Sequence, residues 1–386
     1  MNAGAFHISF DEALREDLRN RIASTRWSDA VTSDWQYGTK LSVLQTLAYY
    51  WRTDYNFDAA EGRLNSLPHA RASIKDFGVT FIRLKGSGNN PIPLLLMNGW
   101  PSSFVEYRKL ASQLAEPAAY GDSGAEAFDV IIPALPGFGY SDRPTQPNQV
   151  NTENLFHSLM TEQLGYSHYF ASGTDIGAGV ATRLALKFPE SVLGIHIASV
   201  VDPPAGTGSQ PLTPAEVRYQ RSTAEWESKE GAYEHVHYTR PQTLAFALTD
   251  SPIGLASWIV DKFYSWTDHD DDLFGVFSLD TLIDNLMVYW ATQTIGSSMR
   301  YYYDTIRFRA PLLSSKRVEV PTAVCMWPKD LVVAPKEWAE RFYNVQQYSL
   351  KPHGGHFPAW EAPEDYAEDL RSFTRSLGHP IRRRYL

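Results

Sequence analysis

An aspartate lies in a glycine-rich turn at the point where an apolar strand is expected to give way to a helix. The turn reads Ser172-Gly173-Thr174-Asp175-Ile176-Gly177-Ala178-Gly179 and follows the apolar run at residues 168–171. Its spacing matches the nucleophile elbow G-x-S-x-G, in which small neighbours permit a tight turn, except that Asp175 replaces the serine. A helix-capping aspartate and a glycine-rich phosphate loop are the alternatives, but neither explains the flanking glycines together with the residues downstream.

An aspartate at this position implies chemistry different from that of a serine. An unperturbed aspartate has a pKa of about 3.9 and is ionised at neutral pH, so Asp175 needs no base to become a nucleophile. A carboxylate attacks a saturated carbon by displacement and forms an alkyl ester, whereas its attack on an ester would yield an anhydride. The residue therefore favours the opening of an epoxide or the displacement of a halide, and it argues against an ordinary esterase or lipase.

Hydrolysis of such an ester requires a general base and an acid that orients it, and two residues near the end of the chain fit these roles. His356 lies in His-Gly-Gly-His-Phe, and Asp330 lies in Trp-Pro-Lys-Asp. Each follows a run expected to be a strand: residues 347–350 and 322–326, respectively. His353 is a rival base, ranked lower because its neighbours are a proline and a lysine. A lone His or Asp in a loop is usually polar surface, but the order Asp175, Asp330, His356 is the nucleophile, acid and base order that accompanies the elbow motif.

Backbone N–H groups can stabilise the oxyanion that forms during ester hydrolysis. The turn Asn98-Gly99-Trp100-Pro101 directly follows the apolar run at residues 92–97. The N–H groups of Trp100 and Ile176 are therefore the candidate oxyanion hole, with a plain strand-ending turn as the alternative. The loop at residues 135–141, Leu-Pro-Gly-Phe-Gly-Tyr-Ser, follows the next strand-like run, and we expect it to shape a wall of the site.

These residues need a scaffold that brings several strand ends together, and the 386-residue chain has the pattern of one. From residue 79, β-rich runs alternate with helical stretches. The runs at residues 93–97 and 130–134 are continuously apolar, as in strands buried on both faces of a parallel sheet. The expected strands are residues 79–84, 92–97, 128–133, 168–172, 192–200, 322–326 and 347–350. The pattern predicts an α/β fold with a mostly parallel, doubly wound sheet.

Two mainly helical segments accompany the predicted sheet. The first 75 or so residues repeat apolar side chains at Leu14, Leu18 and Ile22 and have a second helical run at residues 41–55, which indicates a covering segment. Between about residues 203 and 312 an aromatic, helical block interrupts the strands, as a cap does. We therefore divide the chain into a covering segment (1–78), the core (79–204), the cap (205–315) and the second part of the core (316–386).

Composition argues against several other classes of protein. The net charge of −9 disfavours nucleic acid and anionic lipid as partners. Cys325 is the only cysteine, so no intrachain disulfide can form, and no apolar run approaches the roughly 18 residues of a membrane span. The acidic stretch at residues 268–272 lacks the glycine and closing glutamate of a calcium loop, so we expect no metal there. No basic and apolar leader is visible, and the expected location is cytoplasmic.

The chain resembles the epoxide hydrolases of the microsomal type, a branch of the α/β-hydrolase superfamily with juvenile-hormone and bacterial members. The resemblance covers nearly the whole chain. It rests on residues 6–27, the Asn-Gly-Trp-Pro turn, the Pro-Gly-Phe-Gly-Tyr-Ser loop, the aspartate elbow, the cap stretch at 249–255 and the terminal Gly-Gly-His-Phe. It implies an α/β-hydrolase fold with a helical cap and an N-terminal helical covering segment, no cofactor, a homodimer, and a role in detoxification or secondary metabolism.

The resemblance also implies that two cap tyrosines hydrogen-bond the epoxide oxygen, because the leaving alkoxide requires a proton donor. Local matches place them at Tyr233, in Ala-Tyr-Glu-His, and at Tyr302. Tyr302 stands between Tyr301 and Tyr303, so a slip of one residue is an open alternative. Packing in the core or on the surface is the ordinary role of any one tyrosine in a chain that contains 21 of them.

The chain departs from the family pattern at two positions. Asn98 stands where the oxyanion turn usually begins with histidine, and Ile176 stands where tryptophan often follows the nucleophile. Because the oxyanion hole uses backbone groups, we expect activity to be retained, with altered hydrogen bonding at Asn98 and a wider pocket at Ile176.

The predicted function is the conversion of a small apolar epoxide and water into a vicinal diol, without a cofactor or a metal. The path runs through a covalent ester on Asp175, which water activated by His356 and Asp330 hydrolyses. A haloalkane dehalogenase is the nearest alternative, but the side chain of Ile176 has no N–H to hold a halide. A noncatalytic small-ligand binder is the other alternative, but it would have no need of the three residues together.

Overall fold

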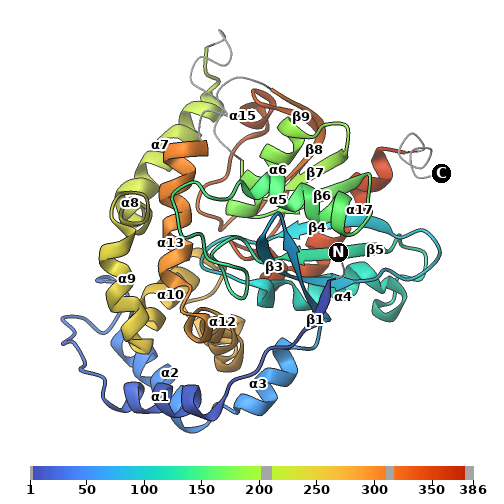
Figure 1. Ribbon diagram of the computed structural model, residues 1–386. Coiled ribbons are helices and arrows are strands. Elements are labelled where there is room, and N and C mark those ends of the chain that lie inside the picture. Colours follow the sequence, from blue (N-terminus) through green and yellow to red (C-terminus); the bar gives the residue numbers. More distant parts are fainter. Residues whose placement is uncertain (1–2, 201–210, 310–316, 379–386) are drawn as a thin grey trace.

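One sheet organises the computed structural model, which describes residues 3–200, 211–309 and 317–378 (Figure 1). The strands of these residues lie in the order β1-β2-β3-β5-β4-β6-β7-β8-β9. The pairs from β5 through β4 to β9 are parallel, and β1, β2, β3 and β5 pair antiparallel. The strands are β1 (Gly4–Phe6), β2 (His69–Ile74), β3 (Phe77–Leu84), β4 (Ile92–Met97), β5 (Phe128–Pro133), β6 (Tyr169–Gly173), β7 (Val192–Ile197), β8 (Val318–Met326) and β9 (Tyr343–Leu350). The prediction of an α/β fold with a mostly parallel sheet is confirmed.

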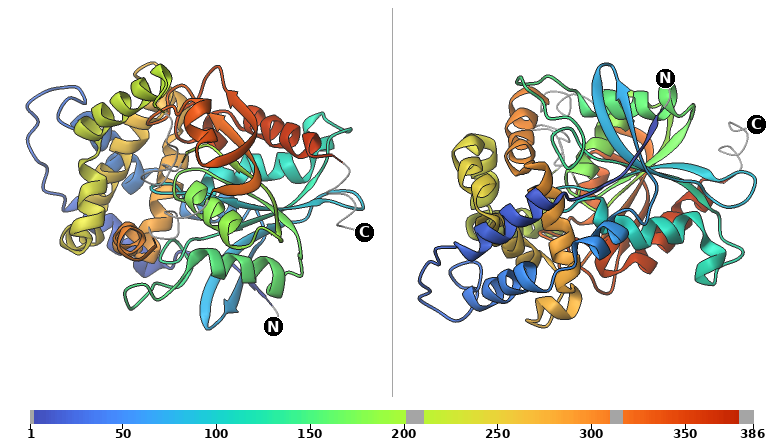
Figure 2. Two further views of the ribbon diagram at one scale, coloured as in Figure 1. Left: turned by 90° about the horizontal axis from the view of Figure 1, so that it is seen from above. Right: turned by 60° about the horizontal axis from the view of Figure 1, so that its bottom comes forward.

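The central strands are mainly apolar, and helices cover both faces of the sheet (Figures 1 and 2). Every residue of β5, β6 and β7 is buried. Helices α4 and α17 contact each other and their neighbouring strands, and α5 and α6 form a second such layer. The core helices are η1 (Phe104–Tyr107), α4 (Arg108–Ala115), η2 (Pro117–Tyr120), α5 (Thr152–Ser158), η3 (Leu159–Gln163), α6 (Ile176–Lys187), α15 (Lys336–Glu340), α16 (Pro358–Glu361) and α17 (Pro363–Ser376).

In the described residues, the block between β7 and β8 consists of helices and the connections between them. Its helices begin where the sequence supplies caps: Thr213 forms a capping box with Glu216, and Ser251 and Ser278 accept N–H groups of α10 and α12. The cap helices are α7 (Pro214–Glu230), α8 (Ala232–Thr239), α9 (Pro241–Asp250), α10 (Pro252–Trp266), α11 (Leu273–Val276), α12 (Leu279–Thr292), α13 (Ile295–Asp304) and η4 (Thr305–Arg309). The divisions predicted at 204/205 and 315/316 lie outside the described residues.

One feature of the cap has the composition of a membrane segment. In the described part of the chain, no single helix is long and apolar enough to cross a membrane. Helices α9 and α10 reach that length and composition only as a pair, and the chain bends by 118° between them.

The N-terminal segment is only partly helical, so the prediction of helix for the first 75 or so residues is wrong for two strands. It contains α1 (Glu12–Ala23), α2 (Leu41–Thr53) and α3 (Phe57–Leu64), but β1 pairs with β2, and β2 pairs with β3. The division predicted at residue 78 falls within β3. The hairpin between β2 and β3 turns through Lys75 and Asp76, both at positive φ. Asn-Gly or Asp-Gly usually marks such a turn, so Lys-Asp gave no signal.

The carboxyl ends of the parallel strands meet at one edge of the sheet, and the cap lies against the loops that leave there. Asn285 of α12 donates a hydrogen bond from Nδ2 to the carbonyl oxygen of Pro101 at 2.9 Å, and Tyr289 donates to that of Ser102 at 2.8 Å. The N–H of His356 donates to the carbonyl oxygen of Trp266 at the end of α10, at 2.8 Å. These bonds hold the cap over the ends of β4 and β9.

Candidate active site

The turn between β6 and α6 is strained in the way the sequence predicts. β6 ends at Gly173 and α6 begins at Ile176, so the chain must reverse within two residues. Asp175 has a φ of 50° and a ψ of −124°, a region that residues other than glycine rarely occupy. A Cβ at position 177 would lie 2.1 Å from the carbonyl oxygen of Met97 on β4, so this position requires glycine. The turn therefore presents the Asp175 carboxylate at the edge of the sheet.

The three predicted triad residues meet beside this turn. Nδ1 of His356 lies 2.7 Å from Oδ1 of Asp330, and Nε2 of His356 lies 3.7 Å from Oδ2 of Asp175. A parallel bridge between Lys329 and Gly355 joins the two loops that carry Asp330 and His356. Since Asp330 accepts the proton on Nδ1, the nitrogen that can exchange a proton with the site is Nε2.

The charges around His356 favour its protonated form. Burial by itself lowers the pKa of His356, but the carboxylates of Asp330, Asp175 and Glu106 outweigh burial and raise the pKa to about 9. The imidazole is therefore cationic at neutral pH while Asp175 is ionised. His353, the rival base, lies at the surface with its Nε2 3.4 Å from Asp365. The structure brings His356, and not His353, to Asp175.

Two backbone N–H groups from different strand ends hold the Asp175 carboxylate. The N–H of Trp100 donates to Oδ1 at 2.9 Å, and the N–H of Ile176 also hydrogen-bonds this carboxylate. Burial raises the pKa of Asp175, whereas His356 and these two N–H groups oppose the rise. A Cβ at Gly99 would lie 1.9 Å from Oδ1, so only glycine leaves room for the carboxylate. The candidate oxyanion donors therefore converge on the side chain that would carry the ester.

The two predicted cap tyrosines pack against the Trp100 indole and against each other, with the two phenol rings 6.4 Å apart between centroids. The ring of Tyr233, on α8, stacks on Trp100 at 5.2 Å between centroids, and the ring of Tyr302, on α13, meets it edge-on at 6.4 Å. Burial first, and then the charge of Asp175, raise the pKa of both phenols well above the ordinary value. Both hydroxyls therefore keep their protons and remain donors near Asp175.

The structure also distinguishes among the three adjacent tyrosines of α13. Tyr301 donates to Oγ1 of Thr152 at 3.0 Å, and the guanidinium of Arg307 lies over the ring of Tyr303. The charge of Asp175 raises the pKa of Tyr302, and the hydroxyl of Tyr302 lies within hydrogen-bonding reach of Tyr233, the other candidate donor. The one-residue slip left open by the sequence is therefore not supported by the geometry.

Two glutamates near His356, the buried Glu106 and the half-buried Glu361, were not identified from the sequence. Glu106, on η1, has an oxygen without a hydrogen-bond partner in the described chain, and burial raises its pKa to about 7. Glu361 accepts N–H groups of Gly355 and Phe357, on either side of His356, at 2.8 and 2.9 Å, and burial raises its pKa to about 7. Glu361 thus fixes the loop that carries the base. Charged residues are usually exposed, and nothing in the spacing of these two marks them as buried.

One group of side chains in the described chain is close enough to surround a metal ion, and it lies away from the triad. It consists of the buried His196, Cys325 and Asp369. His196 already hydrogen-bonds Ser172 and Asp369, both at 3.1 Å, and the ammonium of Lys351 lies 2.7 Å from Asp369. Lys351 supplies the positive charge that a metal ion would bring, so we interpret His196, Asp369 and Lys351 as a buried hydrogen-bond and ion-pair network.

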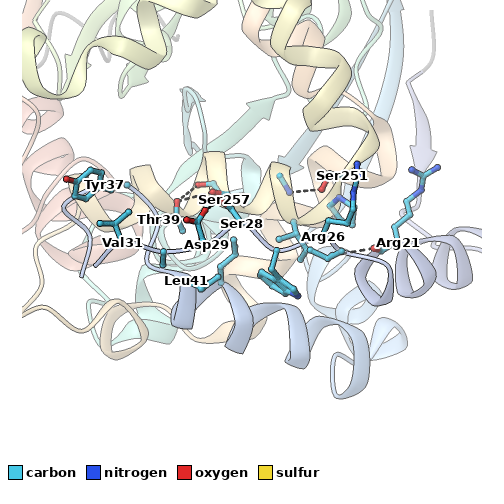
Figure 3. Close-up of a pocket in the computed structure, with 18 of the residues that line it drawn as sticks. Arg21, Arg26, Ser28, Asp29, Val31, Tyr37, Thr39, Leu41, Ser251 and Ser257 are labelled. Carbon is cyan, nitrogen blue, oxygen red and sulfur yellow. Dashed lines mark hydrogen bonds between the residues drawn. The ribbon is translucent and has the colours of Figure 1, made fainter. Parts of the chain in front are cut away.

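Two hollows differ in what lines them. A cavity of about 200 Å³ reaches Asp175, Asp330 and His356, and Tyr219 of α7 forms part of its wall. A pocket of about 810 Å³ lies between the connection from α1 to α2 and the start of α10 (Figure 3). There Thr39 donates to the carbonyl oxygen of Ser257 at 2.7 Å. No triad residue lines this second pocket, so the smaller cavity is the one that belongs to the site.

Comparison with protein families agrees with this geometry. Residues 3–107 match the family model described as epoxide hydrolase N terminus, and residues 92–363 match the α/β-hydrolase fold. Together the two matches span the N-terminal segment, the elbow, the cap and the loops of Asp330 and His356.

Individual relatives cover almost the whole chain. Epoxide hydrolase 1 of Oryctolagus cuniculus is 32% identical over 400 residues, which cover 96% of this chain and 88% of the relative. The crystal structure of juvenile hormone epoxide hydrolase from the silkworm Bombyx mori superposes with a TM-score of 0.88 at 28% identity, over 97% of this chain and 95% of that one. The structure of Aspergillus niger epoxide hydrolase superposes with a TM-score of 0.84 at 25% identity, over 98% of this chain and 97% of that one. This chain therefore belongs to the epoxide hydrolases of the α/β-hydrolase fold.

Proposed function

We propose that this epoxide hydrolase converts a small apolar epoxide into a vicinal diol through a covalent ester on Asp175. The observation that carries the proposal is the arrangement around one carboxylate: Nε2 of His356 at 3.7 Å, the Trp100 N–H at 2.9 Å and an elbow that exposes the carboxylate. A carboxylate held in this way is positioned to attack, and the histidine beside it to act on the product of that attack.

In the first half-reaction an oxygen of Asp175 attacks one oxirane carbon, and the bond from that carbon to the ring oxygen breaks. The resulting alkoxide takes a proton from Tyr233 or Tyr302. Their raised pKa values keep both hydroxyls protonated until the oxygen becomes basic. The products of this step are a hydroxyalkyl ester and a tyrosinate.

Once the ester has removed the charge of Asp175, His356 releases its proton to solvent and becomes a neutral base. In the second half-reaction water attacks the carbonyl carbon of the ester, and His356 takes one of the water protons at Nε2. The N–H groups of Trp100 and Ile176 stabilise the negative charge on the former carboxylate oxygen. Collapse of the tetrahedral intermediate expels the diol oxygen, which takes the proton from His356. The carboxylic acid that remains on Asp175 returns its proton to the tyrosinate. His356 regains a proton from solvent as Asp175 becomes charged again, and the cycle is closed.

The ester is tested by trapping it and by isotope labelling. His356→Gln should still open an epoxide and then stall, so intact mass should rise by the mass of one substrate and the elbow peptide should carry the adduct. His353→Gln, altered at the exposed histidine, is the matched control and should show no adduct. Asp175→Asn should not be alkylated.

A single turnover of wild-type enzyme in water enriched in heavy oxygen gives an independent result. The first diol should be largely unlabelled, because its new oxygen comes from the Asp175 carboxylate, and later diols should carry the label. A fully labelled first diol would mean that water attacks the epoxide directly, and Asp175 would then not be a nucleophile.

A further inference from the structure

A buried histidine extends the polar surface that the two cap tyrosines form. His237 lies one helical turn after Tyr233 on α8, and its side chain is completely buried. Its ring centroid lies 4.6 Å from that of Trp100, 5.0 Å from that of Tyr302 and 5.4 Å from that of Tyr233. His237 is therefore packed among the three aromatic side chains that lie over Asp175.

The hydrogen bonding of His237 settles which ring nitrogen carries its proton. Nε1 of Trp258, on α10, donates to Nε2 of His237 at 3.2 Å. An indole N–H can only donate, so Nε2 is the acceptor and the proton lies on Nδ1. Burial and the nearby charge of Lys262 lower the pKa of His237 to about 3, so the ring is neutral. His237 thus presents one uncharged N–H donor.

That donor has no acceptor in the described part of the protein. Nδ1 of His237 and the indole nitrogens of Trp100 and Trp266, which belong to the same ring cluster, are all buried without a hydrogen-bond partner among the described residues. Buried donors are rarely left in this state, because they lose hydrogen bonds to water without replacing them. Several of them in one aromatic cluster indicate groups whose acceptors arrive with the substrate.

The donors of the cluster have different neighbours. The charge of Asp175 shifts the pKa of Tyr233 and of Tyr302, and the ring of His237 packs against both phenols. The proposed function assigns the tyrosines to the oxirane oxygen, which leaves the N–H of His237 for a neighbouring part of the substrate.

We propose that His237 is a specificity-determining residue whose Nδ1–H binds a second, uncharged hydrogen-bond acceptor of the substrate, such as an ether or carbonyl oxygen next to the epoxide. The inference rests on the proposed function. An anionic acceptor is disfavoured, because His237 carries no charge and the carboxylates of Asp175 and the half-buried Glu234 both act on the cap tyrosines against which its ring packs. The preferred substrates are thus functionalised epoxides, and plain hydrocarbon epoxides of the same shape are poorer ones.

The test compares two epoxides that differ in one atom, phenyl glycidyl ether and 4-phenyl-1,2-epoxybutane. The measured quantity is the ratio of their kcat/KM values in the wild type and in His237→Phe, which keeps an aromatic ring but has no donor. The difference in intrinsic reactivity between the two epoxides is the same for both enzymes, so it cancels when the wild-type ratio is divided by that of His237→Phe. We expect the ether preference to fall by about tenfold in the variant, the worth of one neutral hydrogen bond.

Trp258→Phe is the companion variant, because it removes the group that holds the proton on Nδ1. Its ether preference should fall between those of the wild type and His237→Phe. If His237→Phe does not fold, the test uses the wild type alone. Its kcat/KM for the ether divided by that for the hydrocarbon epoxide must then exceed the same ratio of the two uncatalysed hydrolysis rates, or the inference fails.

Each possible result has a distinct meaning. An unchanged ratio in His237→Phe, with both substrates slowed equally, would show that the N–H is satisfied by the face of the Trp100 indole and that His237 is structural. That result overturns this inference and leaves the epoxide hydrolase mechanism intact. Failure of the wild type to open either epoxide would overturn the proposed function as well.

Discussion

Replacing Asp175 with asparagine should lower the pKa of His356, because it removes a negative charge next to the imidazolium. The asparagine side chain is uncharged and close in shape to the ester that Asp175 would form, so the variant mimics the intermediate. The two charged atoms are 3.7 Å apart and the pair is largely buried. With an effective dielectric constant near 20, such a pair is worth about 4 kcal/mol.

That energy corresponds to roughly a thousandfold change in proton affinity, and water that enters the site reduces it. We therefore expect the pKa of His356 to fall from about 9 by roughly one to three pH units in Asp175→Asn, since the Asp330 contact remains. The sign matters for the mechanism: a lower pKa means more neutral imidazole at pH 7 to 8. Formation of the ester would thus produce the base at the step that needs it.

The assay is a pH titration of ¹⁵N-labelled imidazole by NMR in the wild type and in Asp175→Asn. Asp365→Asn, next to the exposed His353, is the control and should leave the pKa of His356 unchanged. In wild-type single turnovers, ester hydrolysis should accelerate with pH through a pKa below the one measured for His356 in the free enzyme. The reasoning fails if asparagine at position 175 leaves the pKa of His356 unchanged or raises it.

Two further predictions concern groups around the triad. Tyr302→Phe should slow alkylation of Asp175 about 10- to 100-fold in rapid-quench single turnovers, because one of two donors to the leaving oxygen is lost. Tyr301→Phe, whose hydroxyl bonds Thr152, is the matched control, and an equal effect in both variants would remove the special role of Tyr302. The free energy of unfolding of Glu106→Gln, minus that of the wild type, should rise by roughly 2 to 3 kcal/mol between pH 5 and pH 8. The pKa of the glutamate is raised to about 7, so its contribution is present below its unfolded pKa and lost as pH rises through 7. Urea unfolding at the two pH values measures this change, and a pH-independent difference would contradict it.

The parts of the fold that the sequence predicts are those with a short-range signal. The apolar runs of β4 and β5 are buried on both faces, so their composition alone marks them. The elbow is visible because Gly173 and Gly177 are required by close contacts within the turn and with β4. By contrast, β2 alternates small, polar and charged side chains, and its turn lacks the usual glycine, so its pairing with β3 is decided by tertiary contacts.

The parts of the site that the sequence left open or missed depend on contacts between distant segments. Tyr302 could be chosen over its neighbours only once the rotation of α13 about its axis was known, because three adjacent tyrosines face three directions on a helix. Glu106 and His237 are buried polar residues without a periodic pattern, and the acceptor or donor that each meets comes from another element. Burial of polar groups is a property of the assembled core and cap, and a single sequence carries little trace of it.

The two departures from the family pattern can be understood from the same geometry. The donors at the oxyanion position are backbone N–H groups, so the side chain at 176 is free to change from tryptophan to isoleucine without loss of either donor. At position 98, Nδ2 of the asparagine donates to the carbonyl oxygen of Gly99 at 3.0 Å and to Oγ of Ser102 at 3.3 Å. The Asn98 side chain therefore makes its hydrogen bonds within the turn that carries the Trp100 N–H, and not to Asp175 or His356. The Trp100 N–H stays directed at Asp175, so the substitution alters how the turn is supported and leaves this hydrogen bond in place.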